Sequence, residues 1–321
     1  MRIYITLAGL LIFMFACPQA ADDKKNRDIY VRNGIKNQIS WDYAYDGNKP
    51  GKNGKKTSVS FFSPRGDITQ VIAYNPKGQV IHIEKYSYDA HGNKTEYSRF
   101  QGNTDTQADY QKISKYNEAN QLVEENGYDG VEHFSNTYQY DENGDMADIR
   151  YTKNNVLSEK RIFTRNGNTT LVTVYNPSGA VTSKLVLRYD DRKNLVEEAV
   201  YGVNQSELEK KTYNYDENEN LKEEAKYKQD KITLKTTYDY NASGNILNIS
   251  EETPETAKFI KKSFSYDSND NLIEIKWRRK NSEEFNQITY TYNEKGICNT
   301  AITWYPSTKY RVKTKYTYEF Y

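Results

Sequence analysis

Apolar and polar residues alternate in short segments along most of the chain. Before many turns the alternation takes the form aromatic-x-aromatic, as in Tyr138-Gln139-Tyr140 and Tyr238-Asp239-Tyr240. Side chains of a strand point alternately to the two faces of its sheet, so the paired aromatics share one face and the residue between them faces the other way. No segment after the first residues has a sustained helical period. The pattern predicts an all-β chain.

The segments between these strands have the chemistry of turns. Asp or Asn opens most of them, and its side-chain oxygen can accept backbone N–H bonds. Gly92, Gly144 and Gly244 supply the positive φ that is needed before the next strand, and Asn can adopt this conformation where Gly is missing. The sequence therefore predicts antiparallel hairpins.

The turns recur at a regular interval. From Tyr189 to Tyr318 the aromatic residues that lead into turns follow one another at steps of 26, 25, 26, 26 and 26 residues. Such a period indicates a repeat architecture, here with a unit of about 25 residues that holds two strands and two turns. Positions 62, 74, 88, 116 and 140 recur at 163, 175, 189, 215 and 240, which indicates duplication of a larger block. The tyrosines predicted to anchor the repeat are Tyr88, Tyr116, Tyr140, Tyr175, Tyr189, Tyr215, Tyr240, Tyr266, Tyr292 and Tyr318.

Three of the repeats carry a resemblance to a known family. Residues 86–93, 138–145 and 238–245 read YSYDAHGN, YQYDENGD and YDYNASGN, which resembles the Y-x-Y-D-x-x-G-N core of the YD or RHS repeat family. The resemblance covers about residues 57–321. It implies tandem antiparallel β-hairpin repeats that form a curled or spiral meander sheet with the tyrosines inside. Large members form shells around C-terminal toxins, but here the repeats run to Tyr321, so we expect no toxin domain.

The first residues predict export. A short basic start precedes an apolar run from Ile3 to Ala16, which is too short to span a bilayer comfortably. We interpret residues 1–17 as a signal peptide. The segment Met14-Phe15-Ala16-Cys17 resembles a bacterial lipobox, which makes Cys17 the candidate lipidation site. A soluble secreted product is the alternative.

The remaining chain divides into two parts. We expect residues 18–56 to be a tether and an irregular leader, because a charged stretch is followed by a segment rich in Gly, Lys and Asn. Residues 57–321 form the predicted repeat domain. Cys298 is the only cysteine after the signal, so this part can hold no intramolecular disulfide, and we interpret Cys298 as a small buried residue.

Composition limits the partners. The 45 Lys and Arg residues balance 44 Asp and Glu residues to a net charge of +1, so no field of one sign indicates nucleic acid or anionic lipid. A mean hydropathy of -0.96 alone would favour disorder. The 30 tyrosines can still build a thin aromatic core, because each buries a ring while its hydroxyl reaches water or a partner.

Motifs that imitate metal sites are better explained by turns. His82, His91 and His133 lack metal-ligand spacing. Segments that begin at an aspartate and resemble the start of a calcium loop lack the Gly and Glu expected at the sixth and twelfth positions, and we interpret their aspartates as turn caps: Asp141, Asp216 and Asp267. The tripeptide Arg65-Gly66-Asp67 would be an adhesion motif on an exposed loop, but it coincides with a repeat turn.

Three function hypotheses remain. The first is an exported, lipid-anchored and non-enzymatic repeat scaffold that binds a protein or glycan, at the outer membrane or cell surface or else in the periplasm or secreted. The second is a glycan-degrading or lytic enzyme with acids in the concavity of the sheet, and the third is a structural or immunity-like companion of a secretion or toxin locus. For the first we expect no catalytic residue, cofactor or metal ion.

The partner of such a scaffold is not identified by the sequence. We expect no nucleic acid, and membrane contact only through a lipid on Cys17. An outer-membrane barrel is disfavoured because Lys and Glu lie on both faces of segments such as Leu221 to Thr237. Exposed aromatics in a concave surface, with Trp277 and Trp304 as candidates, would mark the ligand site.

Overall fold

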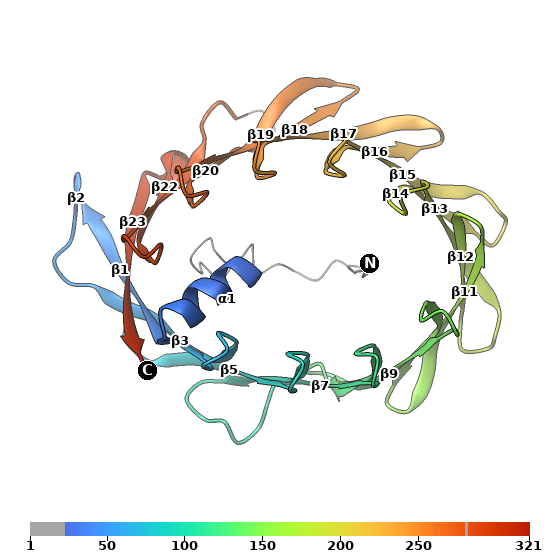
Figure 1. Ribbon diagram of the computed structural model, residues 1–321, viewed down its shortest axis with the longest axis horizontal. Coiled ribbons are helices and arrows are strands. Elements are labelled where there is room, and N and C mark those ends of the chain that lie inside the picture. Colours follow the sequence, from blue (N-terminus) through green and yellow to red (C-terminus); the bar gives the residue numbers. More distant parts are fainter. Residues whose placement is uncertain (1–22, 280–281) are drawn as a thin grey trace.

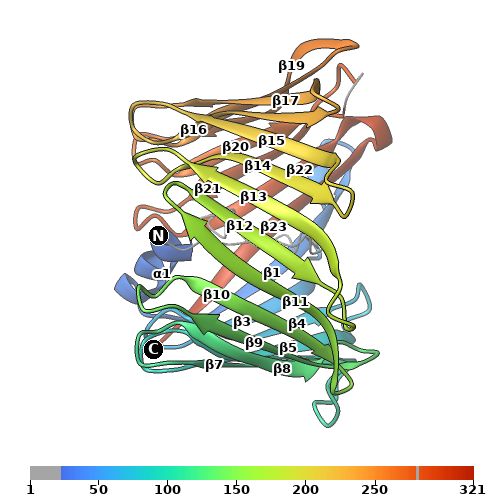
Figure 2. The same ribbon diagram turned by 90° about the vertical axis from the view of Figure 1, so that its right-hand side faces the viewer.

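The computed structural model describes residues 23–279 and 282–321. In this part of the chain the strands form one antiparallel sheet that closes into a barrel of 22 strands. The barrel is seen along its axis as a ring in Figure 1 and from the side in Figure 2. The expectation of a curled or spiral meander sheet is therefore wrong, because the first and last strands of the wall pair with each other.

Strands that follow one another in sequence are neighbours around the wall, as in an up-and-down barrel. The strands are β1 (Ile35–Asp46), β2 (Lys49–Pro50), β3 (Lys55–Phe62), β4 (Ile68–Tyr74), β5 (Val80–Tyr88), β6 (Lys94–Gln101), β7 (Tyr110–Tyr116), β8 (Leu122–Tyr128), β9 (His133–Tyr140), β10 (Met146–Lys153), β11 (Val156–Asn166), β12 (Thr169–Tyr175), β13 (Val181–Tyr189), β14 (Leu195–Gly202), β15 (Glu207–Tyr215), β16 (Leu221–Lys228), β17 (Lys231–Tyr240), β18 (Ile246–Thr253), β19 (Thr256–Tyr266), β20 (Leu272–Trp277), β21 (Asn286–Tyr292), β22 (Cys298–Tyr305) and β23 (Tyr310–Phe320). A short 3-10 helix, Pro306–Thr308, connects the last two.

Strand β1 closes the barrel. It pairs antiparallel with β23 on one side, where Gln38 is opposite Tyr318, and with β3 on the other, where Gln38 is opposite Ser60. The short strand β2 pairs only with the end of β1 and forms an arm beside the wall. The segment expected to be an irregular leader thus supplies a twelve-residue strand. Closure satisfies the backbone groups that an open sheet would leave unpaired at its two edges.

Helix α1 (Asp23–Arg32) lies inside the ring at one mouth, as Figure 1 shows. The charged stretch expected to be a tether therefore includes a helix. Ile29 and Tyr30 explain its position, because both are buried in a cluster with Ile35, Phe62 and Ile297 from the wall and the turns. The rings of Tyr30 and Phe62 are 4.5 Å apart. No helix in the described residues is both long and apolar enough to cross a membrane.

The two mouths of the barrel differ. At the mouth that holds α1, called here the anchor mouth, most turns are of one kind: an Asp, Asn or Ser side chain accepts backbone N–H bonds from residues two and four positions later. Asp216, for example, accepts from the amides of Asn218 and Asn220 at 2.9 and 2.8 Å. These turns curl inward in Figure 1, whereas the connections at the opposite, far mouth flare outward.

The wall is one sheet thick and its two faces differ. Phe62 and Tyr318 contact the internal helix cluster and therefore face inward. Strand alternation and register then place Tyr316 on the same inner face as Ala301 and Tyr290 of the adjacent strands β22 and β21, where the three pack together. The predicted aromatic face is the lumen side.

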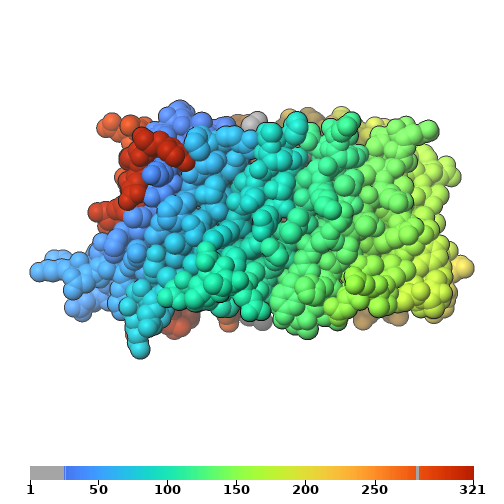
Figure 3. All heavy atoms as spheres, turned by 90° about the horizontal axis from the view of Figure 1, so that it is seen from below, coloured from blue at the N-terminus to red at the C-terminus, as the bar shows by residue number. Residues whose placement is uncertain are grey.

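The outward face carries ion pairs beside apolar side chains: over β3 to β5, Val59 is opposite Ile72 and Ile72 is opposite Ile83. Lys235 lies 2.8 Å from Glu223 on the adjacent strand, and Lys276 lies 2.8 Å from Glu274, both at outward positions of the register. The space-filling view of Figure 3 shows this outer wall as a continuous surface over the strands coloured blue to green.

Candidate functional site

Most of the predicted anchor tyrosines make the same hydrogen bond. The hydroxyl at the end of one strand donates to the backbone carbonyl of the first residue of the preceding strand, as from Tyr292 to Leu272 at 2.7 Å. At the anchor mouth no turn joins these two strands, so the bond fastens one hairpin to the next. The donors are Tyr116, Tyr140, Tyr215, Tyr240, Tyr266, Tyr292 and Tyr318.

The other predicted site residues are placed differently. Tyr175 is at the far mouth, at the end of β12, where it pairs with Lys160 and Val181. Cys17, the candidate lipidation site, lies outside the described residues. Cys298 is fully buried in an inner cluster with Tyr290 and Tyr316.

The tripeptide Arg65-Gly66-Asp67 packs under α1. Asp67 is buried, and its carboxylate lies 3.3 Å from the guanidinium of Arg27 and 3.2 Å from that of Arg65. A side chain added at Gly66 would collide with Arg27 and Val31. The motif therefore belongs to the helix contact and does not form an adhesion loop. Among the described residues no three His, Cys, Asp or Glu side chains gather closely enough to hold a metal ion.

A row of aromatic rings crosses the inner wall. Tyr86, Tyr97, Tyr110 and Phe134, called here the inner aromatic row, come from β5, β6, β7 and β9, and their successive ring centroids are 5.1, 5.5 and 6.5 Å apart. The intervening strand β8 contributes Gly127, which is opposite Phe134 in the register. Because Gly127 has no side chain, the Phe134 ring can lie over β8 and reach Tyr110; a Cβ there would be 2.8 Å from Phe134 Cζ.

Two glutamates flank the inner aromatic row, and each accepts hydrogen bonds from neighbouring side chains. The Tyr86 hydroxyl donates to Glu84 at 2.5 Å, and Glu125 accepts both from Lys112 and from the Tyr138 hydroxyl at 2.7 Å. Burial, with a further contribution from the Glu84 charge, raises the pKa of Tyr97 to about 12. Tyr97 therefore stays a neutral donor at physiological pH.

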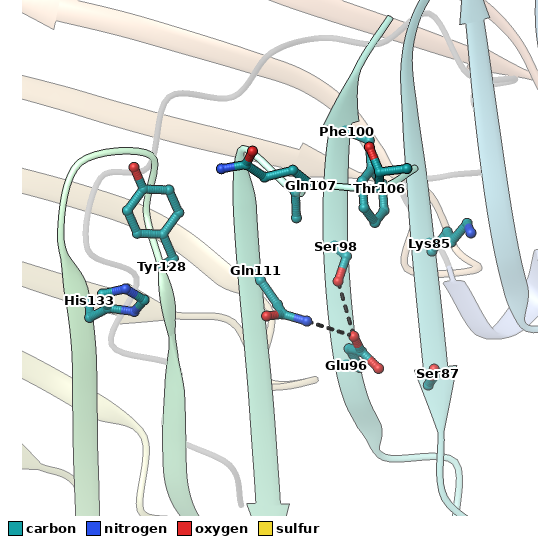
Figure 4. Close-up of a pocket in the computed structure, with 11 residues that line it drawn as sticks. Lys85, Ser87, Glu96, Ser98, Phe100, Thr106, Gln107, Gln111, Tyr128 and His133 are labelled. Carbon is teal, nitrogen blue, oxygen red and sulfur yellow. Dashed lines mark hydrogen bonds between the residues drawn. The ribbon is translucent and has the colours of Figure 1, made fainter. Parts of the chain in front are cut away.

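A separate pocket of about 790 Å³ opens on the outward face of the same strands, shown in Figure 4. The connection between β6 and β7, residues 102–109, contributes Thr106, Gln107 and Ala108 to the lining of this outer pocket. On its floor, Glu96 Oε1 accepts hydrogen bonds from Ser98 Oγ at 3.1 Å and Gln111 Nε2 at 3.0 Å. The rings of Tyr128 and His133 lie side by side at one end, with centroids 5.2 Å apart.

A second cavity of about 1150 Å³ lies between α1 and the anchor-mouth turns that precede β20 and β22. Its lining mixes both signs of charge, with Lys25, Arg32 and Lys295 beside Asp28 and Glu294. The Lys25 ammonium donates a hydrogen bond to the backbone carbonyl of Asp270, in the turn that precedes β20. This cavity is the space left around the docked helix.

The two tryptophans predicted as ligand-site candidates, Trp277 and Trp304, face opposite sides of the wall. Trp277 points inward at the far mouth and packs edge-on against Tyr305, with ring centroids 5.9 Å apart. Trp304 is opposite Gln287 and Arg311 on the outward face. Neither belongs to the inner aromatic row or to the outer pocket, and the sequence marked no residue of these two surfaces as a candidate for ligand binding.

Comparison with known proteins gives distant similarities only. No protein-family model matches the chain, and no curated protein matches it. Among solved structures, TcdB2-TccC3 without its hypervariable C-terminal region aligns at 11% identity and a TM-score of 0.30 over 88% of this chain, and the chain spans 19% of that protein's length. A porin-like protein from Bacteroides uniformis aligns at 10% identity and a TM-score of 0.33, over 89% of this chain and 98% of the other. A porin-like protein from Bacteroides vulgatus aligns at 9% identity and a TM-score of 0.24. Scores this low carry no argument about function, and membership of the YD or RHS repeat family stays a prediction.

Proposed function

We propose that this chain is a non-enzymatic binding scaffold of the cell envelope, and that its ligand surface is the inner wall of the barrel. The ligand is an extended glycan or a segment of protein. One observation carries the proposal: the inner aromatic row, with Gly127 placed so that Phe134 can continue it across β8. Large neutral rings with nearby hydroxyl and charged donors are the usual lining of a binding site for such ligands.

The charges beside the row support binding over catalysis. Glu125 is held by Lys112 and Tyr138, and Glu84 accepts from Tyr86. These acids orient neighbouring side chains in the scaffold that we propose.

The outward ion pairs support a barrel that stands in water within the envelope. Lys235 with Glu223 and Lys276 with Glu274 lie on the face that lipid would cover, where an apolar band would be required. In our proposal the attachment to the membrane is a lipid on Cys17. Mass spectrometry of the mature protein for a diacylglycerol on Cys17 tests the attachment separately from ligand binding.

The binding proposal is tested by exposing the mature protein to glycan arrays and to envelope extracts. We expect the wild type to retain at least one ligand. The Tyr97→Ala and Tyr110→Ala variants should each bind that ligand at least tenfold more weakly. Tyr201→Ala is the matched control, because Tyr201 is opposite Lys184 at an outward position of the wall. Retention of nothing above background, or equal loss in the control, would overturn the proposal.

A further inference from the structure

The outer pocket has a counterpart elsewhere in the barrel where a lysine side chain lies over the matching tyrosine ring. The block duplication places β14, β15 and β16 in the second block where β6, β7 and β8 stand in the first. The register matches: Ser98 is opposite Gln111 and Gln111 opposite Tyr128, and in the second block Ala199 is opposite Lys210 and Lys210 opposite Tyr227. The two places can therefore be compared position by position.

In the second block a lysine side chain lies where the first block has the outer pocket. Lys210 Nζ lies 5.0 Å from the centre of the Tyr227 ring and 3.0 Å from the Asp230 carboxylate. Ala199 has no exposed surface. In the first block the shorter Gln111 turns instead to Glu96, at 3.0 Å, and leaves the Tyr128 ring uncovered by a cation. The residue at this position, Gln111 or Lys210, is thus one difference between the two places.

The connections at the far mouth add to this difference. Residues 102–109 join β6 to β7, whereas the shorter run 203–206 joins β14 to β15. The longer connection adds Thr106 and Gln107 to the lining of the pocket, and Figure 4 shows Thr106 beside Phe100. It forms the end of the pocket at the far mouth.

The groups inside the pocket define the chemistry of the ligand. Glu96 offers a carboxylate whose Oε1 is already held by Ser98 and Gln111, so the group is fixed in position. The charge of Lys85 is matched by Asp105 at 2.5 Å, which leaves Glu96 as the one uncompensated charge among the described residues of the lining. The Tyr128 and His133 rings offer an apolar edge next to these acceptors.

We propose that the outer pocket binds a neutral saccharide of a few rings. Sugar hydroxyls donate to a fixed carboxylate and to the Gln111 amide oxygen, while the C–H face of a sugar ring packs on an aromatic ring. A volume of about 790 Å³ falls within the range of sites for small ligands. Glu96 repels sugars that carry a carboxylate or sulfate. This site is independent of the proposed inner-wall function, because it lies on the opposite face of the wall.

Titration calorimetry of the full mature chain with neutral, amino-bearing and anionic oligosaccharides of two to four rings tests the proposal. We expect binding of at least one neutral oligosaccharide and at least tenfold weaker binding of anionic ones. Tyr128→Ala and Glu96→Gln should each reduce the affinity for the neutral oligosaccharide at least tenfold. Gln111→Lys, which copies the second block, should abolish binding while the chain remains folded, since the same wall already accommodates Lys210.

Tyr227→Ala is the matched control, because Tyr227 is the counterpart of Tyr128 in the second block. It should bind the saccharide like the wild type. The proposal is overturned if no neutral oligosaccharide binds at millimolar concentration, if anionic ones bind as well as neutral ones, or if Gln111→Lys binds unchanged. This experiment does not depend on whether the inner wall binds a ligand. Either proposal can therefore be refuted while the other stands.

Discussion

The hydroxyl of Tyr318 donates a 2.7 Å hydrogen bond to the backbone carbonyl of Cys298, the first residue of the adjacent strand. The two residues are separated by 20 positions, and Tyr292 with Leu272 and Tyr266 with Ile246 repeat the spacing. The bond joins strands at the mouth where no turn connects them. The tyrosines recur at a regular interval in the sequence because each one hydrogen-bonds its hairpin to the neighbouring hairpin.

Replacing one of these tyrosines by phenylalanine tests the fastening. Tyr292→Phe removes the donor to the Leu272 carbonyl and keeps the ring, so we expect a loss of about 1 kcal/mol in the free energy of unfolding. Chemical denaturation measures it. Tyr201→Phe, on the outward face, is the control and should change stability by less than about 0.5 kcal/mol. Equal values for the two variants would show that the hydroxyl bond contributes nothing.

The contact between α1 and the closing strands makes a second prediction. Ile297 is 1% exposed and packs in the cluster of Ile29, Ile35 and Phe62. Ile297→Ala should cost about 2–5 kcal/mol, because it removes buried methyl groups and leaves a cavity. Hydrogen exchange should then accelerate first in β1 and β23. Ile232→Ala, at an exposed position, should leave both measurements unchanged; uniform acceleration over the whole wall would contradict the role of the cluster as a local clasp.

Gly127 makes a third prediction. A Cβ at this position would lie 1.9 Å from the backbone oxygen of Gln111 and 2.8 Å from Phe134 Cζ. Gly127→Ala should destabilise the barrel by about 1–3 kcal/mol, since the wall must shift to relieve the overlap. Thermal unfolding measures the loss. Phe134→Ala added to Gly127→Ala should not restore stability, because the tighter contact is with the backbone; full rescue would locate the strain in the aromatic ring alone.

The turn caps predict a dependence on acid. The hydrogen bond from the Asn220 side chain, followed by those from backbone amides, lowers the pKa of Asp216 below its ordinary value of 3.8. A carboxyl with a lowered pKa in the folded state stabilises the fold above its unfolded pKa and loses that contribution as pH falls through the folded value. Asp216 should therefore stabilise the barrel at neutral pH and cease to do so in strong acid.

The Asp216→Asn variant removes the carboxylate charge and keeps an oxygen that can cap the turn. Asn241 and Asn293 cap equivalent turns, so asparagine keeps the bonds from the backbone amides. Urea unfolding at a series of pH values should find the variant less stable at neutral pH, with a difference from the wild type that narrows below pH 3.8. A difference that is constant from neutral to acid pH would mean that the carboxylate charge plays no part.

Local features of the fold could be predicted from the sequence. The Tyr-x-Tyr alternation predicted a shared aromatic face, and in the structure Tyr290 and Tyr316 pack together on the inner wall. The turn chemistry depends on neighbouring residues only, and Asp216 caps its own turn as the pattern indicates. Such features are set within one hairpin, where contacts are close in sequence.

The candidate sites could not be predicted in the same way. The inner aromatic row depends on Gly127 lying between rings from other strands, and the outer pocket on Gln111 standing where the second block has Lys210. Each of these residues is visible in the sequence. Their effect depends on register between strands and on which neighbour fills the space, and a single sequence pattern does not contain that information.

The sequence by itself determined the strands, the turns, the spacing of about 25 residues between equivalent turns and the face that the paired aromatics share. Only the tertiary structure decided that the sheet closes. Closure requires Gln38 to meet Tyr318 from the other end of the chain, and this depends on the twist and stagger accumulated over every strand between them. The same hairpin pattern is compatible with an open spiral or a closed barrel, because each hairpin makes the same local contacts in both.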